Sequence, residues 1–158
     1  MTHLRRSDRR IDDMTELKEI VEKADVCRIA FADTGMPYIV AMSFGYSWDD
    51  RPVLYFHSAK AGRKIDFLRK NSLVCFEMDI DREIYKNEEP CRWGVKFRSI
   101  VGYGTLAIVA DPAERLRGLE LIMQHYKFPG KPVFDDKVLS VTEVLKLEVT
   151  EINGKKKQ

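Results

Sequence analysis

The sequence VLYFHSAKAGRKIDFLRKN, residues 53–71, decides the fold of this chain. It begins with an apolar run of β-branched and aromatic residues, Val53 to Phe56, which predicts a strand entering a core. Small and polar residues follow, and the run breaks at Gly62. After this glycine, Ile65 and Leu68 are spaced as on one face of a short helix. The stretch therefore predicts a strand that passes through a tight turn into a helix.

The predicted turn combines the features that bind phosphate. A helix N-terminus presents free backbone N–H groups and the positive end of the helix dipole. The stretch also carries five basic residues against one acid, Asp66, and a solvated charged face would explain such a cluster. However, Arg63 and Lys64 fall in the first helical turn, where the dipole disfavours cations. Because a bound anion would remove this conflict, we predict a phosphate site here.

Length and charge limit the class of protein. The 158 residues suit a single domain, 1–158, in which residues 1–12 and 154–158 are expected to be a flexible lead segment and tail. A formal charge of +2 gives no reason to expect nucleic acid as a partner. No apolar run reaches the roughly 20 residues that span a bilayer, and the start lacks a signal peptide's apolar segment. We expect a cytoplasmic protein with no membrane partner.

The three cysteines do not form a metal or disulfide pattern. Cys27, Cys75 and Cys91 are far apart and lack C-x-x-C spacing, so neither a zinc site nor a disulfide framework is expected. Cys27 and Cys75 lie in apolar strand-like runs and are expected in the core. Cys91 follows a proline in a polar stretch, where its reactivity depends on its surroundings.

Alternating patterns predict further strands, and helical periodicity predicts two further helices. The chain contains no dinucleotide-binding G-x-G-x-x-G, P-loop, G-x-S-x-G or H-E-x-x-H motif. One helix is expected to start at Asp13 or Thr15, and another after Asp111-Pro112. The expected strands, besides the one at Val53, are Val26–Ala32, Tyr38–Tyr46, Leu73–Asp79, Lys96–Val109 and Val144–Ile152.

Turn residues between these strands favour hairpins. Asp33-Thr34-Gly35 and Asp49-Asp50-Arg51-Pro52 have the composition of tight turns. Strands joined mostly by hairpins, with helices appended instead of alternating with strands, argue against a doubly wound parallel sheet. They predict a mainly β fold, an antiparallel β-barrel with appended helices.

Three features allow two interpretations each. Gly102 and Gly104 share a strand face, which suits either a sharp barrel bend or a ligand close to the backbone. Residues 81–90 are charged and are expected to form a loop that either covers a site or is mobile. The apolar stripe of the helix after Asp111, from Leu116 to Tyr126, suits core packing or a subunit contact. A further loop is expected at 127–138, where Pro129, Gly130 and Pro132 occur.

Four ordered blocks resemble a known family. RRSDRRI, PYIVAMSFGY, FHSAKAGRKIDFLRKN and WGVKFRSIVGYG are similar to blocks of the FMN-binding split-barrel proteins related to pyridoxamine 5′-phosphate oxidase, and most similar to the nitroimidazole-resistance-like branch. The resemblance covers nearly the whole chain. It implies an antiparallel split β-barrel that binds FMN, with haem as the alternative cofactor because some split-barrel relatives bind it.

The resemblance also assigns residues. Arg63 and Lys64 match the family's phosphate-binding pair, and Trp93 would lie near the site. Ser99 stands where oxidase relatives carry a flavin-contacting glutamine. The remaining implied cofactor residues are His57, Ser58 and Lys60 on the phosphate and ribityl side, and Ala41, Met42, Ser43 and Phe44 along the isoalloxazine ring.

The implied activity is that of an FMN-dependent oxidoreductase, a flavin reductase or nitroreductase-like enzyme. It would reduce a small aromatic or nitro-substituted molecule with electrons from a nicotinamide donor, with His57 as the candidate proton donor. The alternative is a flavin- or haem-binding protein without turnover. The arginine- and histidine-containing motif that reads pyridoxine phosphate is absent from residues 142–158, which argues against vitamin B6 oxidation. The resemblance implies a homodimer with cofactor sites at the subunit interface.

Overall fold

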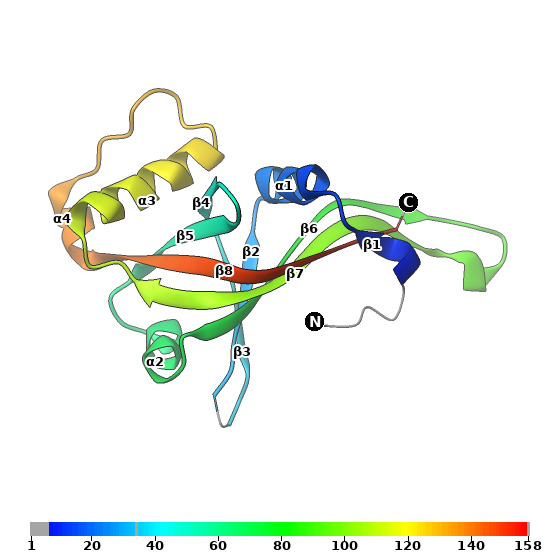
Figure 1. Ribbon diagram of the computed structural model, residues 1–158, viewed down its shortest axis with the longest axis horizontal. Coiled ribbons are helices and arrows are strands. Elements are labelled where there is room, and N and C mark those ends of the chain that lie inside the picture. The colour runs from blue at the N-terminus through cyan, green and yellow to red at the C-terminus, as the bar shows by residue number, and fades with distance from the viewer. Residues whose placement is uncertain (1–6, 34, 158) are drawn as a thin grey trace.

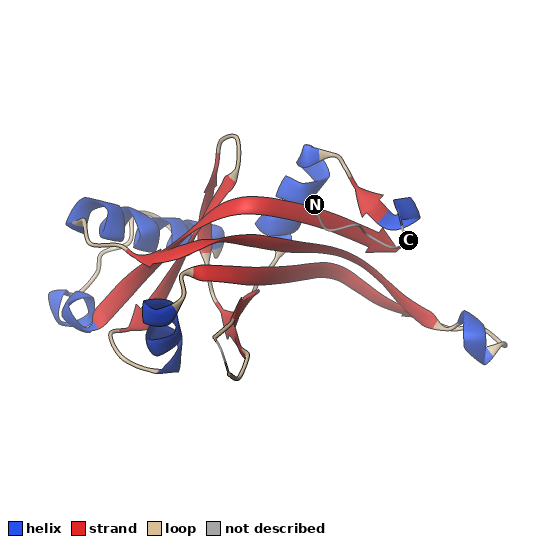
Figure 2. Ribbon diagram, turned by 60° about the horizontal axis from the view of Figure 1, so that its bottom comes forward, coloured by secondary structure: helices blue, strands red, loops and turns tan. Residues whose placement is uncertain are grey.

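Three long antiparallel strands, β6, β7 and β8, form the spine of the molecule (Figures 1 and 2). The computed structural model describes residues 7–33 and 35–157. Within them, eight strands form one sheet in the order β3-β2-β6-β7-β8-β5-β4, with β1 paired to β8. The elements are η1 (Ser7–Arg9), β1 (Arg10–Ile11), α1 (Met14–Lys23), β2 (Cys27–Phe31), β3 (Tyr38–Met42), β4 (Gly45–Trp48), β5 (Pro52–Ala59), α2 (Arg63–Lys70), β6 (Leu73–Tyr85), η2 (Pro90–Arg92), β7 (Gly94–Ile108), α3 (Pro112–His125), α4 (Asp136–Val141) and β8 (Thr142–Lys157).

Every strand pair in the described sheet is antiparallel, which confirms the predicted mainly β class. Both predicted hairpins form: β2 pairs with β3, and β4 pairs with β5 through Trp48 and Pro52. The inward faces of the strands make one large core, to which residues such as Phe56 and Phe76 contribute fully buried rings. Each such side chain stabilises the fold by roughly 1.5–3 kcal/mol through burial.

Helix ends follow the capping signals of the sequence. Asp13 caps α1 by accepting from the Thr15 amide at 2.8 Å, and Asp111 caps α3 by accepting from the Glu114 amide at 2.8 Å. Both helices therefore begin where the capping residues predicted. In α3, Leu119 and Ile122 are buried in a second, smaller core with Tyr55, while Leu116 remains exposed. Core packing therefore accounts for the middle of the predicted apolar stripe.

The predicted strand Tyr38–Tyr46 is wrong as one element, because the chain leaves β3 after Met42 and starts β4 at Gly45. A Cβ at Gly45 would lie 2.3 Å from the backbone of Leu121 and Ile122. The chain therefore passes directly against α3 at Gly45. As a result, β3 and β4 lie at opposite ends of the strand order. Large and small residues continue to alternate through this bend, so the sequence pattern gave no sign that the strand ends at Met42.

The expected loop at 81–90 is wrong for its first half. β6 continues to Tyr85, pairs with Gly94 of β7, and shifts register between Ile80 and Glu83. Asp81 takes a positive φ of 54° at this shift, which lets the hairpin extend beyond the barrel (Figure 2). The expected loop at 127–138 is likewise shorter, since α4 begins at Asp136.

The two ends that were expected to be flexible are paired in strands where the structure describes them. Ile11 of β1 is buried, and β8 continues to Lys157 along β7. Gly154 lies under α1 and β1, and a Cβ there would be 2.4 Å from Leu17 and 2.8 Å from Ile11. Close packing therefore orders a tail whose composition suggested disorder. Residues 1–6 and 158 of these segments lie outside the described residues.

Packing also explains the two glycines of β7. A Cβ at Gly102 would lie 2.5 Å from the Phe76 ring, and one at Gly104 would lie 2.4 Å from the Glu148 carbonyl oxygen. The register of β7 against β8 shifts between Tyr103 and Gly104. The barrel-bend interpretation therefore accounts for both positions.

Candidate functional site

The turn between β5 and α2 has the geometry that the sequence predicted. β5 ends at Ala59, and α2 begins at Arg63 after Gly62, whose φ of 129° places it in a region that favours glycine. No side chain caps this helix, so its first N–H groups point out of the helix without a capping acceptor. A Cβ at Gly62 would meet nothing within 4 Å. The helix N-terminus is therefore open to an anion.

The basic residues of this stretch divide into two groups. Arg69 lies 3.8 Å from Asp66, and Lys70 lies 2.9 Å from Asp33, a hydrogen bond that raises the pKa of Lys70. Among the described residues, no ion pair neutralises the cations at the other end of the helix, Lys60, Arg63 and Lys64. The charge of the cluster is thus balanced at the helix C-terminus and unbalanced at the N-terminus, where the anion is expected.

Helix α2 is fixed against the start of β3 by an aromatic cluster. The Arg63 guanidinium lies over the Tyr38 ring at 5.5 Å from its centroid. Tyr38 stacks on Phe67 at 5.5 Å and lies 5.8 Å from Phe31. These contacts hold Arg63 beside β3. Tyr38 was not predicted as a site residue, because its contact with Arg63 joins elements that are separated by two strands along the chain.

The predicted ring-lining segment, residues 41–44, alternates in exposure. Ala41 and Ser43 are exposed, whereas the side chains of Met42 and Phe44 are buried in the core. Small side chains therefore face outward along this edge, and a flat ring could approach them and the backbone closely. Met42 and Phe44 can contribute only main-chain groups to that surface.

His57 and Ser58 point to opposite faces of β5, as consecutive strand residues do. His57 is exposed on the strand that leads to Gly62. Ser58 is buried, and its hydroxyl donates to the carbonyl oxygen of Ala59 at 2.9 Å. The structure thus makes the His57 side chain, but not the Ser58 hydroxyl, accessible on the strand that leads into the turn.

Ser99 and Trp93 are not brought to this turn within the chain. Thr105 of β7 pairs with Leu73, just after α2, and Ser99 lies six positions earlier along β7, or about 20 Å at the rise of a strand. Trp93 lies farther along, where its indole N–H donates to the Asn87 carbonyl oxygen. Both views place this hairpin end far from α2 (Figures 1 and 2).

A large cleft lies elsewhere, between α1, β4 and the C-terminal end of α3. It has a volume of about 950 Å³ and is lined by Tyr46, Trp48 and His125 among others, but by none of the predicted cofactor residues. The accessible ones among the predicted residues of β3, β5 and α2, such as Ala41, His57 and Arg63, instead lie on an exposed surface. Such a surface becomes a closed pocket only when something covers it. No helix within residues 7–33 and 35–157 is both long and apolar enough to span a membrane.

Comparisons with known proteins agree with the fold. The family model described as pyridoxamine 5′-phosphate oxidase matches residues 13–156. A protein from Bacteroides thetaiotaomicron, proposed to be a 5-nitroimidazole antibiotic resistance protein, is 29% identical with a TM-score of 0.80, over 92% of this chain and 85% of its own. This match confirms the resemblance to the nitroimidazole-resistance-like branch. No curated protein matches the chain.

Two more distant structures share the split-barrel fold. An FAD and haem binding protein from Mycobacterium smegmatis is 17% identical with a TM-score of 0.82, over 95% of this chain and 74% of its own. A flavocytochrome from Azotobacter vinelandii is 18% identical with a TM-score of 0.79, over 99% of this chain and 72% of its own. The sheet order, the antiparallel pairing and the family match over residues 13–156 together lead to one conclusion: the chain belongs to the pyridoxamine 5′-phosphate oxidase family of flavin-binding split-barrel proteins.

Proposed function

We propose that the protein is an FMN-dependent oxidoreductase whose cofactor phosphate binds at the N-terminus of α2. The observation that carries this proposal is the set of cations without carboxylate partners, Lys60, Arg63 and Lys64, around an uncapped helix start. A phosphate dianion matches this donor set, because the helix amides and the basic side chains all favour negative charge. Membership of a flavin-binding family supports FMN as the molecule that carries the phosphate.

The residues fit the remaining parts of FMN as well. The exposed His57 would donate a hydrogen bond near the phosphate, and the exposed small side chains of Ala41 and Ser43 would form a flat wall for the ring. Met42 would contribute backbone groups. FMN, when bound, supplies the redox chemistry, and the protein binds and orients it.

The proposed substrate is a small aromatic or nitro-substituted molecule, reduced with electrons from a nicotinamide donor. The similarity to the Bacteroides protein, at 29% identity, supports this class. We propose His57 as the proton donor, because it is the histidine that is exposed on β5 beside the phosphate turn. The variant His57→Ala, assayed at an FMN concentration that saturates it, should lose turnover, and unchanged turnover would remove His57 from the mechanism.

The proposed assembly is a homodimer. Ser99 and Trp93 lie too far from α2 in one chain to contact the same FMN, so these two residues would reach the cofactor from the second subunit. The surface around Ala41, His57 and Arg63 is open in one chain, and a second copy would cover it. Sedimentation of the FMN-loaded protein as a monomer would contradict this assembly.

The decisive experiment compares two double variants of α2. Arg63→Ala/Lys64→Ala removes two of the three cations that lack a carboxylate partner, and the matched control Arg69→Ala/Lys70→Ala removes two paired cations from the same helix. We expect the first to weaken FMN binding by on the order of 100-fold or more, since hydrogen bonds to charged groups contribute about 1.5–3 kcal/mol each. The control should change the dissociation constant by less than about threefold. Full FMN occupancy in the first variant would refute the site.

The alternative function is binding of flavin or haem without turnover. Its support is that split-barrel structures of the same fold include an FAD and haem binding protein and a flavocytochrome. The absorbance spectrum of the purified protein separates the cofactors, because flavin gives two visible bands and haem gives one intense Soret band. A flavin spectrum without any reductase activity toward nitroaromatic substrates would favour the binding protein.

A further inference from the structure

The link between β3 and β4 is held by a residue more than eighty positions later in the chain. Ser43 and Phe44 belong to no strand, so the sheet does not fix their backbone. The Phe44 amide donates to the Tyr126 hydroxyl oxygen at 3.2 Å. The same hydroxyl donates to the Asp25 carbonyl oxygen at 2.6 Å. One side-chain oxygen therefore ties this link to the connection between α1 and β2.

The neighbouring His125 strengthens the same tie. Its Nε2 lies 2.8 Å from the Ala24 carbonyl oxygen, and its ring lies 4.4 Å from the Phe44 ring. Tyr126 lies edge-on to His125 at 4.9 Å between centroids. Two adjacent residues at the end of α3 thus contact Phe44 on one side and the residues after α1 on the other.

The end of α3 is rigid enough to act in this way. Lys127 takes a left-handed φ of 58°. Its amide donates to the Gln124 carbonyl oxygen at 3.0 Å, and the Phe128 amide donates to the Met123 carbonyl oxygen at 2.9 Å. These two bonds are those of a Schellman motif. Tyr126 precedes this fixed turn, so its side chain leaves the helix in a defined direction.

The hydrogen bond to Phe44 matters because the residue is fully buried. A buried amide that loses its acceptor is destabilised, since water cannot replace the bond. Without the Tyr126 hydroxyl, the link would move to satisfy this amide. Ser43, whose exposed side chain is part of the proposed ring wall, would move with it.

We propose that Tyr126 is a positioning residue that fixes the Met42–Phe44 wall against which the flavin ring lies. This inference rests on the proposed function, because it assigns the ring to that wall. Tyr126 lines the cleft between α1, β4 and α3 and reaches the wall from there through the Phe44 amide. The proposed cofactor lies on the outward side of the wall with Ala41 and Ser43, which are exposed. Productive contact with a rigid planar ring depends on placement within about 0.5 Å, so a shift of the link weakens cofactor binding without any change in the residues that contact it.

The test is Tyr126→Phe, which keeps the ring and removes the hydroxyl. The matched control is Tyr55→Phe, which removes another hydroxyl bound to α3, that of Tyr55 to Glu114 at 3.3 Å, without touching the link. Thermal unfolding of both apo-variants shows that they fold. Amide hydrogen exchange of Phe44 and the FMN dissociation constant, with the visible circular dichroism of bound flavin, are then measured for both.

We expect Tyr126→Phe to accelerate exchange of the Phe44 amide on the order of tenfold and to weaken FMN binding several-fold, with an altered flavin dichroism. Tyr55→Phe should change none of these. Unchanged Phe44 exchange in Tyr126→Phe, or faster exchange with unchanged FMN affinity, would overturn the proposal. If the wild-type protein binds no FMN, the proposed function itself fails and Tyr126 has no cofactor role, while Phe44 exchange still reports whether the hydroxyl holds the link.

Discussion

At the scale of single residues, the surroundings of the three cysteines set how each can react. Cys27 is fully buried, and burial raises the pKa of its thiol strongly. Cys75 is half-buried on the outer face of β6, and burial also raises its pKa, although a hydrogen bond with Tyr103 opposes this shift. Cys91 is exposed in η2. Thiolate formation therefore costs most at Cys27.

These environments predict three different labelling rates. With a water-soluble disulfide reagent at neutral pH, Cys91 should react first, Cys75 more slowly, and Cys27 only when the protein unfolds, since the thiolate is the reactive form. The variant Cys91→Ser should lose the fast phase. A fast phase that persists in this variant would contradict the assignment, and peptide mapping of the labelled protein would identify the residue responsible.

The role of Gly102 could not be predicted from the sequence. The spacing of Gly102 and Gly104 suited a bend or a ligand equally, and only the Phe76 ring and the Glu151 carbonyl oxygen, at 2.5 and 2.6 Å from a Cβ built at Gly102, decide between them. Both partners come from other strands. A pattern within one strand does not reveal what the neighbouring strands place against it.

Gly102→Ala should therefore lower the free energy of unfolding by about 1–3 kcal/mol, because one close neighbour is backbone and cannot turn aside. The matched control is Gly35→Ala, where a Cβ would meet nothing within 4 Å and stability should change by less than about 0.5 kcal/mol. Chemical denaturation measures both. Equal stability of the two variants would show that β7 has room at Gly102.

At the scale of elements, sequence patterns predicted the elements that depend on neighbouring residues of the chain. The strand, the turn at Gly62 and α2 all form as the stretch at 53–71 indicated. The break between β3 and β4 was missed because its cause, α3 packed against Gly45, lies about eighty residues later. The pairing of Lys70 with Asp33 was equally invisible, although it separates neutralised cations from those available to a phosphate.

The C-terminus of α3 gives a prediction at this scale. Lys127 occupies the left-handed position of the Schellman motif, which favours glycine because a Cβ there crowds the backbone. Lys127→Gly should raise the free energy of unfolding by about 1 kcal/mol. The matched variant Lys131→Gly, in the loop after α3, lacks a positive φ to relieve and should not stabilise. Thermal denaturation measures both variants. A lower unfolding midpoint for Lys127→Gly than for Lys131→Gly would contradict this account.

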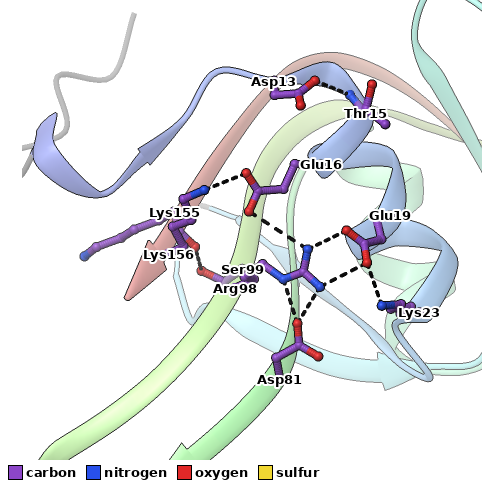
Figure 3. A network of polar contacts seen from close by, with 10 residues as sticks. All are labelled: Asp13, Thr15, Glu16, Glu19, Lys23, Asp81, Arg98, Ser99, Lys155 and Lys156. Atoms are coloured by element: carbon purple, nitrogen blue, oxygen red, sulfur yellow. Dashed lines mark hydrogen bonds and ion pairs between the residues drawn. The ribbon is translucent and has the colours of Figure 1, made fainter. Parts of the chain in front are cut away.

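At the scale of the whole molecule, an ion-pair network joins α1 to the long strands (Figure 3). Arg98 of β7 lies 2.6 Å from Glu19 and contacts Asp81 of β6. Lys156 of β8 lies 2.8 Å from Glu16. The network connects the N-terminal helix with the last strand, so the predicted flexible tail is part of the structure. The antiparallel class could be predicted from the hairpins. The contact of α1 with β7 and β8 could not be predicted, because it forms only when the whole sheet is assembled.

The network makes stability depend on pH through Glu19. The hydrogen bond from Arg98, followed by that from Lys23, lowers the pKa of Glu19 from 4.5 to about 2. A carboxyl with a lowered pKa in the folded state contributes stability above its unfolded pKa and loses that contribution as the pH falls. The contribution of Glu19 should therefore be complete above pH 4.5 and disappear progressively between pH 4.5 and about 2.

The variant Glu19→Gln isolates this contribution, because the amide keeps the shape and cannot titrate. Its unfolding midpoint in urea should lie below that of the wild type at pH 6, and the gap should narrow steadily as the pH is lowered from 4.5 toward 2. Glu22→Gln, on the same helix but without an ion pair to Arg98, whose partners are Glu16, Glu19 and Asp81, should leave the wild-type profile unchanged. Parallel profiles for wild type and Glu19→Gln over this range would mean that Arg98 holds α1 by packing alone and that the ion pair adds nothing to the closure of the sheet.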